Sequence, residues 1–140
     1  MGEARTQLGW LEANLFIHPL FENDAHAPRC RAVLESVLAG AAEGWVDWIT
    51  LHELSYVLPR VLPGRFTRRQ DVCDYLLGYL TCETVFADDK DTMIDTLCLW
   101  AKATARFGDV RLAVLAERRK MAVCTVNASD VASVPNTYPG

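Results

Sequence analysis

The sequence predicts an α/β domain in which a central parallel sheet of four to five strands is covered by helices on both faces, a three-layer α/β/α arrangement. Two observations predict this class. Short apolar runs alternate along the chain with longer segments whose apolar residues recur at helical spacing, and this alternation is typical of parallel sheets. The 140 residues, 51% of them hydrophobic, are enough for one continuous core, so we expect a single domain over 1–140.

In the first half of the chain, two strands are each followed by a helix. The apolar run 8–11 predicts a buried strand, and apolar residues three and four apart predict a helix over 28–38, which Gly40 ends. The run 45–49 predicts the second strand. A helix over 50–62 follows, because its leucines form one apolar stripe.

The second half repeats the pattern. The polar segment Thr67–Gln70 has the form of a capping box, which predicts the start of a helix that runs to about Leu80. The remaining expected elements are a strand over 84–86, a helix from Asp88 or Asp89 to Arg106, a helix over 109–120 and a strand over 122–125.

The composition predicts a soluble, cytoplasmic protein. The five cysteines are odd in number and include no C-x-x-C pair, which favours reduced thiols over a disulfide framework or a zinc site. No apolar stretch approaches the roughly 20 residues of a membrane span. The net charge of −4 argues against coating nucleic acid by bulk charge, but it leaves local basic patches open.

Five acidic or amide side chains carry the functional prediction. They follow short apolar runs or open a helix, and they are Glu12, Glu53, Asp109, Asn127 and Asp130. In an open α/β sheet such positions converge at the carboxyl edge of the strands, where these folds place their sites. Oxygen ligands of this kind favour Mg²⁺ or Mn²⁺ over zinc.

Each of these residues also has a purely structural explanation. Glu53 lies three residues after Thr50, which is the spacing of a capping box. Asp109 follows a glycine at an expected helix start, where aspartate is a favoured cap. Asn127 and Asp130 suit a turn after a strand, and Glu12 suits a solvent-facing strand end.

The order and context of these residues resemble the PIN-domain nucleases. The matching motifs are Glu12-Ala13-Asn14-Leu15-Phe16, Thr50-Leu51-His52-Glu53-Leu54, Phe107-Gly108-Asp109-Val110-Arg111-Leu112-Ala113 and Thr125-Val126-Asn127-Ala128-Ser129-Asp130-Val131. Small single-domain members of this family are often VapC-type toxins of toxin–antitoxin pairs. Two positions depart from the pattern, because the family has aspartate where this chain has Glu12, and Asn127 replaces an acid.

The resemblance implies a PIN-like fold and Mg²⁺- or Mn²⁺-dependent hydrolysis of RNA phosphodiester bonds. It implies catalytic roles for the five residues above, with Glu12, Glu53, Asp109 and Asp130 on the metal. Asn14 and Thr125 would orient those carboxylates or touch phosphate. It also implies a cognate antitoxin and a homodimer as partners. The longer side chain of Glu12 predicts attenuated activity.

Arginines around the turn at Pro63 and Gly64 are candidate RNA contacts, namely Arg60, Arg65, Arg68 and Arg69. The alternative is a solvated loop between two helices. Two other functions stay open. One is a PIN-like module that binds RNA or a protein partner with little catalysis. The other is a Mg²⁺-dependent phosphatase-like hydrolase, which needs a lysine beside a strand-end aspartate.

Overall fold

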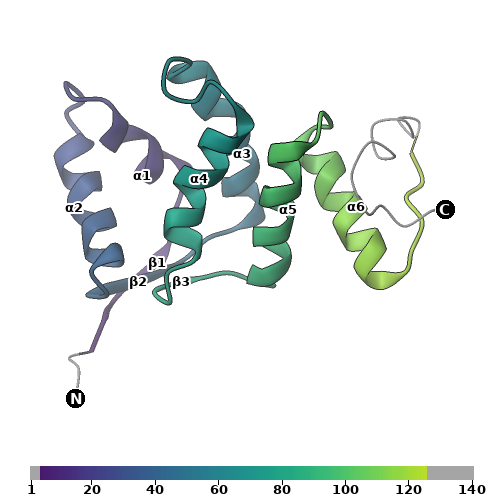
Figure 1. The fold of residues 1–140 in the computed structure, drawn as a ribbon. Coiled ribbons are helices and arrows are strands. Elements are labelled where there is room, and N and C mark those ends of the chain that lie inside the picture. Colours follow the sequence, from purple (N-terminus) through teal and green to yellow (C-terminus); the bar gives the residue numbers. More distant parts are fainter. Residues whose placement is uncertain (1–3, 126–140) are drawn as a thin grey trace.

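Strands and helices alternate along the chain around a parallel sheet (Figure 1). The computed structural model describes residues 4–125. The elements are, in chain order, β1 (Thr6–Trp10), α1 (Ala13–Ile17), the 3-10 turn η1 (His18–Leu20), α2 (Ala27–Leu38), β2 (Ala42–Trp45), α3 (Trp48–Val61), α4 (Arg69–Leu80), β3 (Val85–Phe86), α5 (Lys90–Lys102) and α6 (Phe107–Arg119). The predicted α/β class is confirmed.

Each strand of the sheet is parallel to its neighbour, in the order β1-β2-β3. The last residues of the strands share one register row, with Trp10 opposite Trp45 and Trp45 opposite Phe86. The β1–β2 register is irregular between Gln7 and Trp10, where Gly9 has a φ of +77°. Glycine reaches this left-handed region without steric cost. The parallel direction of all three strands confirms the predicted parallel pairing.

The strand predicted over 122–125 does not form, and the described residues contain three strands rather than four to five. Lys120 ends α6 with a φ of +55°, and the Met121 N–H donates to the Ala116 carbonyl oxygen at 2.8 Å. Beyond this turn the chain lies on the side of α6 that faces away from the sheet (Figure 1). An apolar run becomes a strand only beside another strand, and none of the three strands within residues 4–125 pairs with this run.

The boundaries around β2 also differ from the prediction, which placed a strand over 45–49 and a helix from residue 50. The strand ends at Trp45, Asp47 is extended with a φ of −98° and a ψ of 154°, and α3 already begins at Trp48. A short apolar run suits the first turn of a buried helix as well as a strand. The first strand is likewise displaced, to Thr6–Trp10 from the predicted 8–11.

The core lies between the sheet and the helices (Figure 1). The predicted leucine stripe of α3 is part of it, since Leu51, Leu54 and Leu58 are buried. Burial of each such side chain stabilises the fold by roughly 1.5–3 kcal/mol. Close packing of β1 on β2 depends on Gly44, because a Cβ there would lie 2.7 Å from Leu11 Cδ2. The core thus sets the position of the carboxyl end of β1.

No helix within residues 4–125 combines the length and the apolar character that crossing a membrane requires.

Candidate acidic site and arginine-lined groove

Helices α3 and α6 meet at an aromatic contact between His52 and Phe107, whose ring centroids are 5.7 Å apart. Gly108 borders this contact, since a Cβ there would lie 3.4 Å from His52 Cε1. Glu53 follows His52 in the chain, and Asp109 follows Gly108. The contact therefore brings two of the predicted acidic residues onto adjoining helix segments.

Asp109 is the third residue of α6, and the helix begins at Phe107 after Arg106 in the capping position. The interpretation of Asp109 as the helix cap is therefore wrong. Its half-buried carboxylate lies in the first turn, where the helix dipole favours negative charge. Asp109 thus keeps a favourable electrostatic setting without being used as a cap.

Glu53 lies in the second turn of α3 and is exposed. A capping box between Thr50 and Glu53 does not form, because α3 begins two residues before Thr50 and is preceded by Asp47. The structural explanation for Glu53 is thereby removed, and its carboxylate is available to a ligand.

Glu12 occupies the capping position of the short helix α1, with a φ of −90° and a ψ of 167°, and makes no side-chain capping hydrogen bond. The preceding Leu11 is buried and its N–H donates to the Trp45 carbonyl oxygen at 2.7 Å. Glu12 itself is exposed at the carboxyl end of β1, and so is Asn14 in the first turn of α1. Helix α1 packs against α3, so Glu12 and Glu53 belong to neighbouring elements.

Although Glu12, Glu53 and Asp109 lie on neighbouring elements, they do not form a metal-binding group. Within residues 4–125, no three histidine, cysteine, aspartate or glutamate side chains gather into a group that could hold a metal ion. The oxygen donors Glu12, Glu53 and Asp109 match Mg²⁺ or Mn²⁺ in chemistry but do not form such a group. Asn127 and Asp130 lie outside the described residues. Thr125 is half-buried in the segment after α6.

A groove of about 850 Å³ opens beside the α3–α6 contact and is lined by His52 and Phe107 themselves. Four arginines line it, namely Arg60, Arg68, Arg69 and Arg106. No carboxylate among the described residues shares the lining. Such a groove suits a polyanion. Arg106 is absent from the sequence-based candidates, although it directly precedes the motif that begins at Phe107, and this position is the one signal in the sequence that points to it.

The four arginines predicted to contact RNA differ in their surroundings. Arg60 stacks on Tyr56, with Cζ 3.8 Å from the ring centroid. Arg68 pairs with Asp71 at 3.1 Å. The main chain of Arg68 also donates to Asp71 Oδ2 at 2.9 Å, so the capping box uses Asp71 rather than the predicted Gln70. Arg65 lies 5.5 Å from the Phe66 ring centroid and does not line the groove.

Arg69 is bound to the main chain at the end of α5. Its Nη1 donates to the carbonyl oxygens of Trp100, Ala103 and Ala105 at 3.1, 2.9 and 2.6 Å. Burial lowers the pKa of the guanidinium. These bonds satisfy carbonyl groups that α5 leaves open, and the helix ends at Lys102 instead of the predicted Arg106.

The lysine that a phosphatase-like hydrolase requires is not supplied by Lys90. Its Nζ donates to the Cys82 and Val85 carbonyl oxygens at 2.7 and 2.6 Å. Burial lowers the pKa of this ammonium group. Lys90 thus holds the turn that leads into β3.

The chain was compared with known proteins at three levels. It matches no protein-family model, no curated protein and no solved structure. The PIN resemblance therefore rests on the four short motifs and on their order along an α/β chain.

Proposed function

We propose that the protein is a Mg²⁺- or Mn²⁺-dependent endoribonuclease of the PIN type that acts as the toxin of a type II toxin–antitoxin pair. One observation carries the proposal. His52 and Phe107 line the arginine groove, and the residues next to His52 and next to Gly108 are Glu53 and Asp109. Acidic residues on the helix segments that border a cationic groove suit metal-dependent phosphodiester hydrolysis.

The residues have separate roles in this proposal. Arg60, Arg68 and Arg106 hold the phosphate backbone in the groove, and the Tyr56 ring under Arg60 offers a surface on which a base stacks. Glu12, Glu53 and Asp109, with Asn127 and Asp130, hold the metal and orient the attacking water. Asn14 and Thr125 orient these carboxylates. The bound ion supplies charge neutralisation at the scissile phosphate.

Cleavage of a structured RNA pool by the purified protein, with Mg²⁺ or Mn²⁺, tests this function. We expect cleavage that EDTA and Asp109→Asn abolish and that the control Glu22→Gln, an exposed acid outside the site, leaves unchanged. Calorimetric titration with Mn²⁺ gives a second readout, in which Asp109→Asn weakens binding. Cleavage that persists in EDTA contradicts the proposal.

Glu12→Asp tests the departure from the family pattern. The shorter side chain restores the carboxylate position of the family, and metal sites lose activity when a ligand is displaced by more than about 0.5 Å. We therefore expect Glu12→Asp to cleave faster than the natural chain. An equal or slower rate would show that Glu12 is already in the productive position or outside the site.

A second candidate function is a PIN-like module that binds RNA or a protein without cutting it. It is favoured by the lack of a metal-holding group among the described carboxylates. This module would bind RNA through the arginine groove with no metal dependence, and Glu12→Asp would not create cleavage. Electrophoretic mobility shifts beside the cleavage assay separate the two candidates.

The toxin role is tested in cells. Expression of the chain alone is expected to arrest growth, and Asp109→Asn is expected to relieve the arrest. The cognate antitoxin should restore growth when it is coexpressed, and sedimentation measures the proposed homodimer.

A further inference from the structure

A row of three aromatic side chains crosses the exposed face of the sheet. Trp10, Trp45 and Phe86 are the last residues of β1, β2 and β3. The ring centroids of Trp10 and Trp45 are 6.1 Å apart, and those of Trp45 and Phe86 are 5.5 Å apart. Trp10 is 67% exposed and Trp45 is 40% exposed. We call these three residues the aromatic row.

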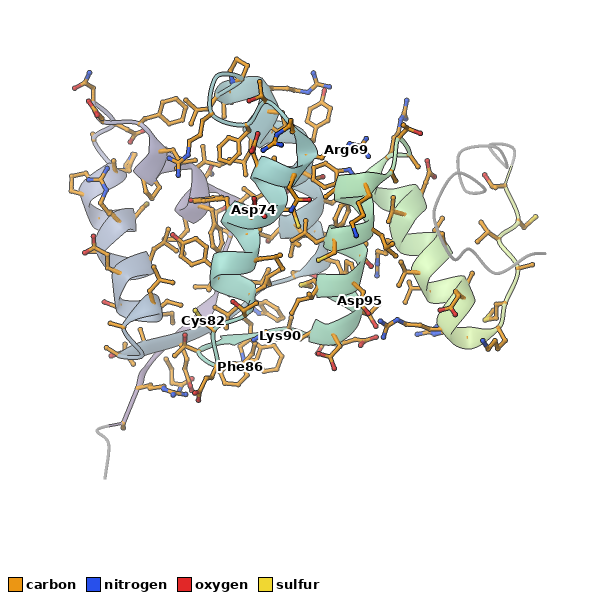
Figure 2. All side chains as sticks on the ribbon, viewed as in Figure 1. Arg69, Asp74, Cys82, Phe86, Lys90 and Asp95 are labelled. Carbon is orange, nitrogen blue, oxygen red and sulfur yellow. The ribbon has the colours of Figure 1, made fainter. Side chains whose placement is uncertain are left out.

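The aromatic row does not belong to the core. The neighbouring residues Leu11, Val46 and Val85 are buried, so alternation along each strand turns the row to the opposite face. Figure 2 shows Phe86 below the sheet, on the side away from the helices. Exposed aromatic side chains that touch one another form a continuous apolar surface of the kind that marks interaction sites.

An acidic rim accompanies the row, because each strand continues from its aromatic residue through one apolar residue to an acid. The acids are Glu12, Asp47 and Asp88, all exposed. Among the described residues, none of the three makes a side-chain ion pair or hydrogen bond. Negative charge therefore borders the aromatic row at the carboxyl end of the sheet.

Two cations near this face, Arg5 and Lys90, are already engaged. Arg5 pairs with Glu43 at 3.5 Å and with Glu83 at 3.6 Å. The Lys90 ammonium donates to two main-chain carbonyl groups. Thr92 and, to a smaller extent, the positive charges of Arg118 and Arg119 lower the pKa of Asp89, next to Asp88, but no described cation pairs with Glu12, Asp47 or Asp88. The negative charge of the rim decides which occupant the row accepts.

We propose that the aromatic row and its acidic rim bind a segment of a separate protein that carries apolar and cationic side chains. Lysine or arginine would pair with the rim and stack on the tryptophan rings. Nucleic acid and anionic lipid would instead bring phosphate against three carboxylates. A second copy of this chain would bring two acidic rims together. The charge of the rim therefore favours a basic peptide over the other three occupants.

The aromatic row is separate from the arginine groove, and of the rim only Glu12 also belongs to the proposed metal site, so the row and the rim acids Asp47 and Asp88 do not depend on the proposed nuclease. Figure 2 shows Arg69, which lines the groove, and Phe86, which belongs to the row, at opposite ends of the molecule. The protein thus has a cationic groove at one end and an acidic aromatic surface at the other.

Fluorescence anisotropy of a dye-labelled amphipathic peptide of leucine and arginine tests the proposal on the full-length chain. We expect saturable binding that weakens with salt, and no binding of the same peptide with glutamate in place of arginine. The double variant Trp10→Ser/Trp45→Ser should lower the affinity by about tenfold or more. Asp47→Asn/Asp88→Asn should lower it by a smaller factor.

Matched controls separate the row from non-specific attraction. Ile49 and Leu112 are 65% and 50% exposed but lie outside the row, so Ile49→Ser/Leu112→Ser should bind the peptide normally. Glu22→Gln/Glu35→Gln removes the same charge as the rim variant at exposed positions elsewhere and should also bind normally. Circular dichroism checks the fold, and Trp10→Ser alone serves if the double variant does not fold.

Five results would overturn the proposal. One is peptide binding that Trp10→Ser leaves unchanged. Three more are binding of oligouridylate RNA, binding of anionic vesicles, and dimerisation of the chain, each lost in the tryptophan variants. The fifth is absence of peptide binding to the natural chain.

Discussion

His52 packs against Phe107 with their ring centroids 5.7 Å apart, and this contact joins α3 to α6 at the edge of the arginine groove. Residue 108 borders this contact: a Cβ there would lie 3.4 Å from the His52 ring, in ordinary van der Waals contact, and a longer side chain would reach the ring. The relative position of Glu53 and Asp109 is therefore coupled to the size of residue 108.

Gly108→Ala should be tolerated and should raise the free energy of unfolding by up to about 1 kcal/mol. The added Cβ makes an ordinary van der Waals contact, and alanine loses less backbone entropy than glycine in a helix. Gly108→Leu should instead displace His52 and lower both stability and RNA binding. Urea unfolding and an RNA mobility shift measure the two effects, and equal behaviour of both variants contradicts the coupling.

Arg69→Ala should lower the free energy of unfolding by about 2 kcal/mol, because it leaves carbonyl groups at the end of α5 without a charged donor. Arg60→Ala is the matched control. Arg60 is exposed and stacks only on Tyr56, so its loss should change stability by less than about 0.5 kcal/mol. Urea unfolding of the two variants tests this difference.

The same pair separates stability from RNA binding. Arg60→Ala should weaken RNA binding by removing one phosphate contact and reduce its salt dependence. If Arg60→Ala leaves RNA affinity unchanged, the groove is not the RNA site.

Gly44→Ala should destabilise the fold by roughly 1–3 kcal/mol, because the added methyl group overlaps Leu11 Cδ2 at 2.7 Å and approaches the Gly9 carbonyl oxygen at 3.0 Å. Leu11 precedes Glu12, so the displacement should also reach the candidate site. Combining Gly44→Ala with Leu11→Ala removes the overlap. The double variant should therefore lose less free energy of unfolding than the two single variants lose in sum. Additive losses would show that the contact does not limit the approach of β1 to β2.

Cys73 should react far more slowly with iodoacetamide than Cys124 at about pH 8. Burial raises the pKa of the Cys73 thiol to about 12, and the neighbouring Cys98 adds to the rise. Cys124 is exposed. Mass spectrometry of the alkylated chain measures both rates. Rapid labelling of Cys73 in the folded protein would contradict its burial in the α4–α5 contact.

The sign of the linked pH effect follows from the raised pKa. Below the ordinary pKa of 9.0 the thiol is protonated in both folded and unfolded chains, so its full contribution to stability is present. As the pH rises from 9.0 towards about 12, the unfolded chain loses this proton first and stability falls. Cys73→Ala should flatten this part of the stability profile.

Local sequence patterns predicted those elements whose own residues suffice to specify them. The helix predicted over 28–38 appears as Ala27–Leu38, and the helix predicted over 67–80 appears as Arg69–Leu80. Their apolar periodicity already matches the face that becomes buried. The run 45–49 failed as a strand beyond Trp45 because so short an apolar run suits a helix start equally well.

The functional prediction likewise contains a part that local motifs supply and a part that depends on contacts between distant segments. The motifs predicted five acidic or amide site residues, and their roles stay a prediction. The α3–α6 contact joins His52, which precedes Glu53, to Phe107, two residues before Asp109. The described residues form no metal-holding group, so the metal site remains a prediction. Arg106 and the aromatic row were not predicted, because each depends on segments that are distant in the chain.

The sequence by itself determined the α/β class, the parallel sheet and the leucine stripe of α3, because periodicity and burial are local properties of the chain. Only the tertiary structure decided that 122–125 has no strand to pair with, that Arg69 ends α5 and that three strand-end aromatic residues form one exposed surface. All three features require contacts between segments that are distant in the chain: pairing of strands, hydrogen bonds from a distant side chain to the end of a helix, and packing of aromatic residues from different strands. Those contacts are fixed by the packing of the whole domain and by no single stretch of residues.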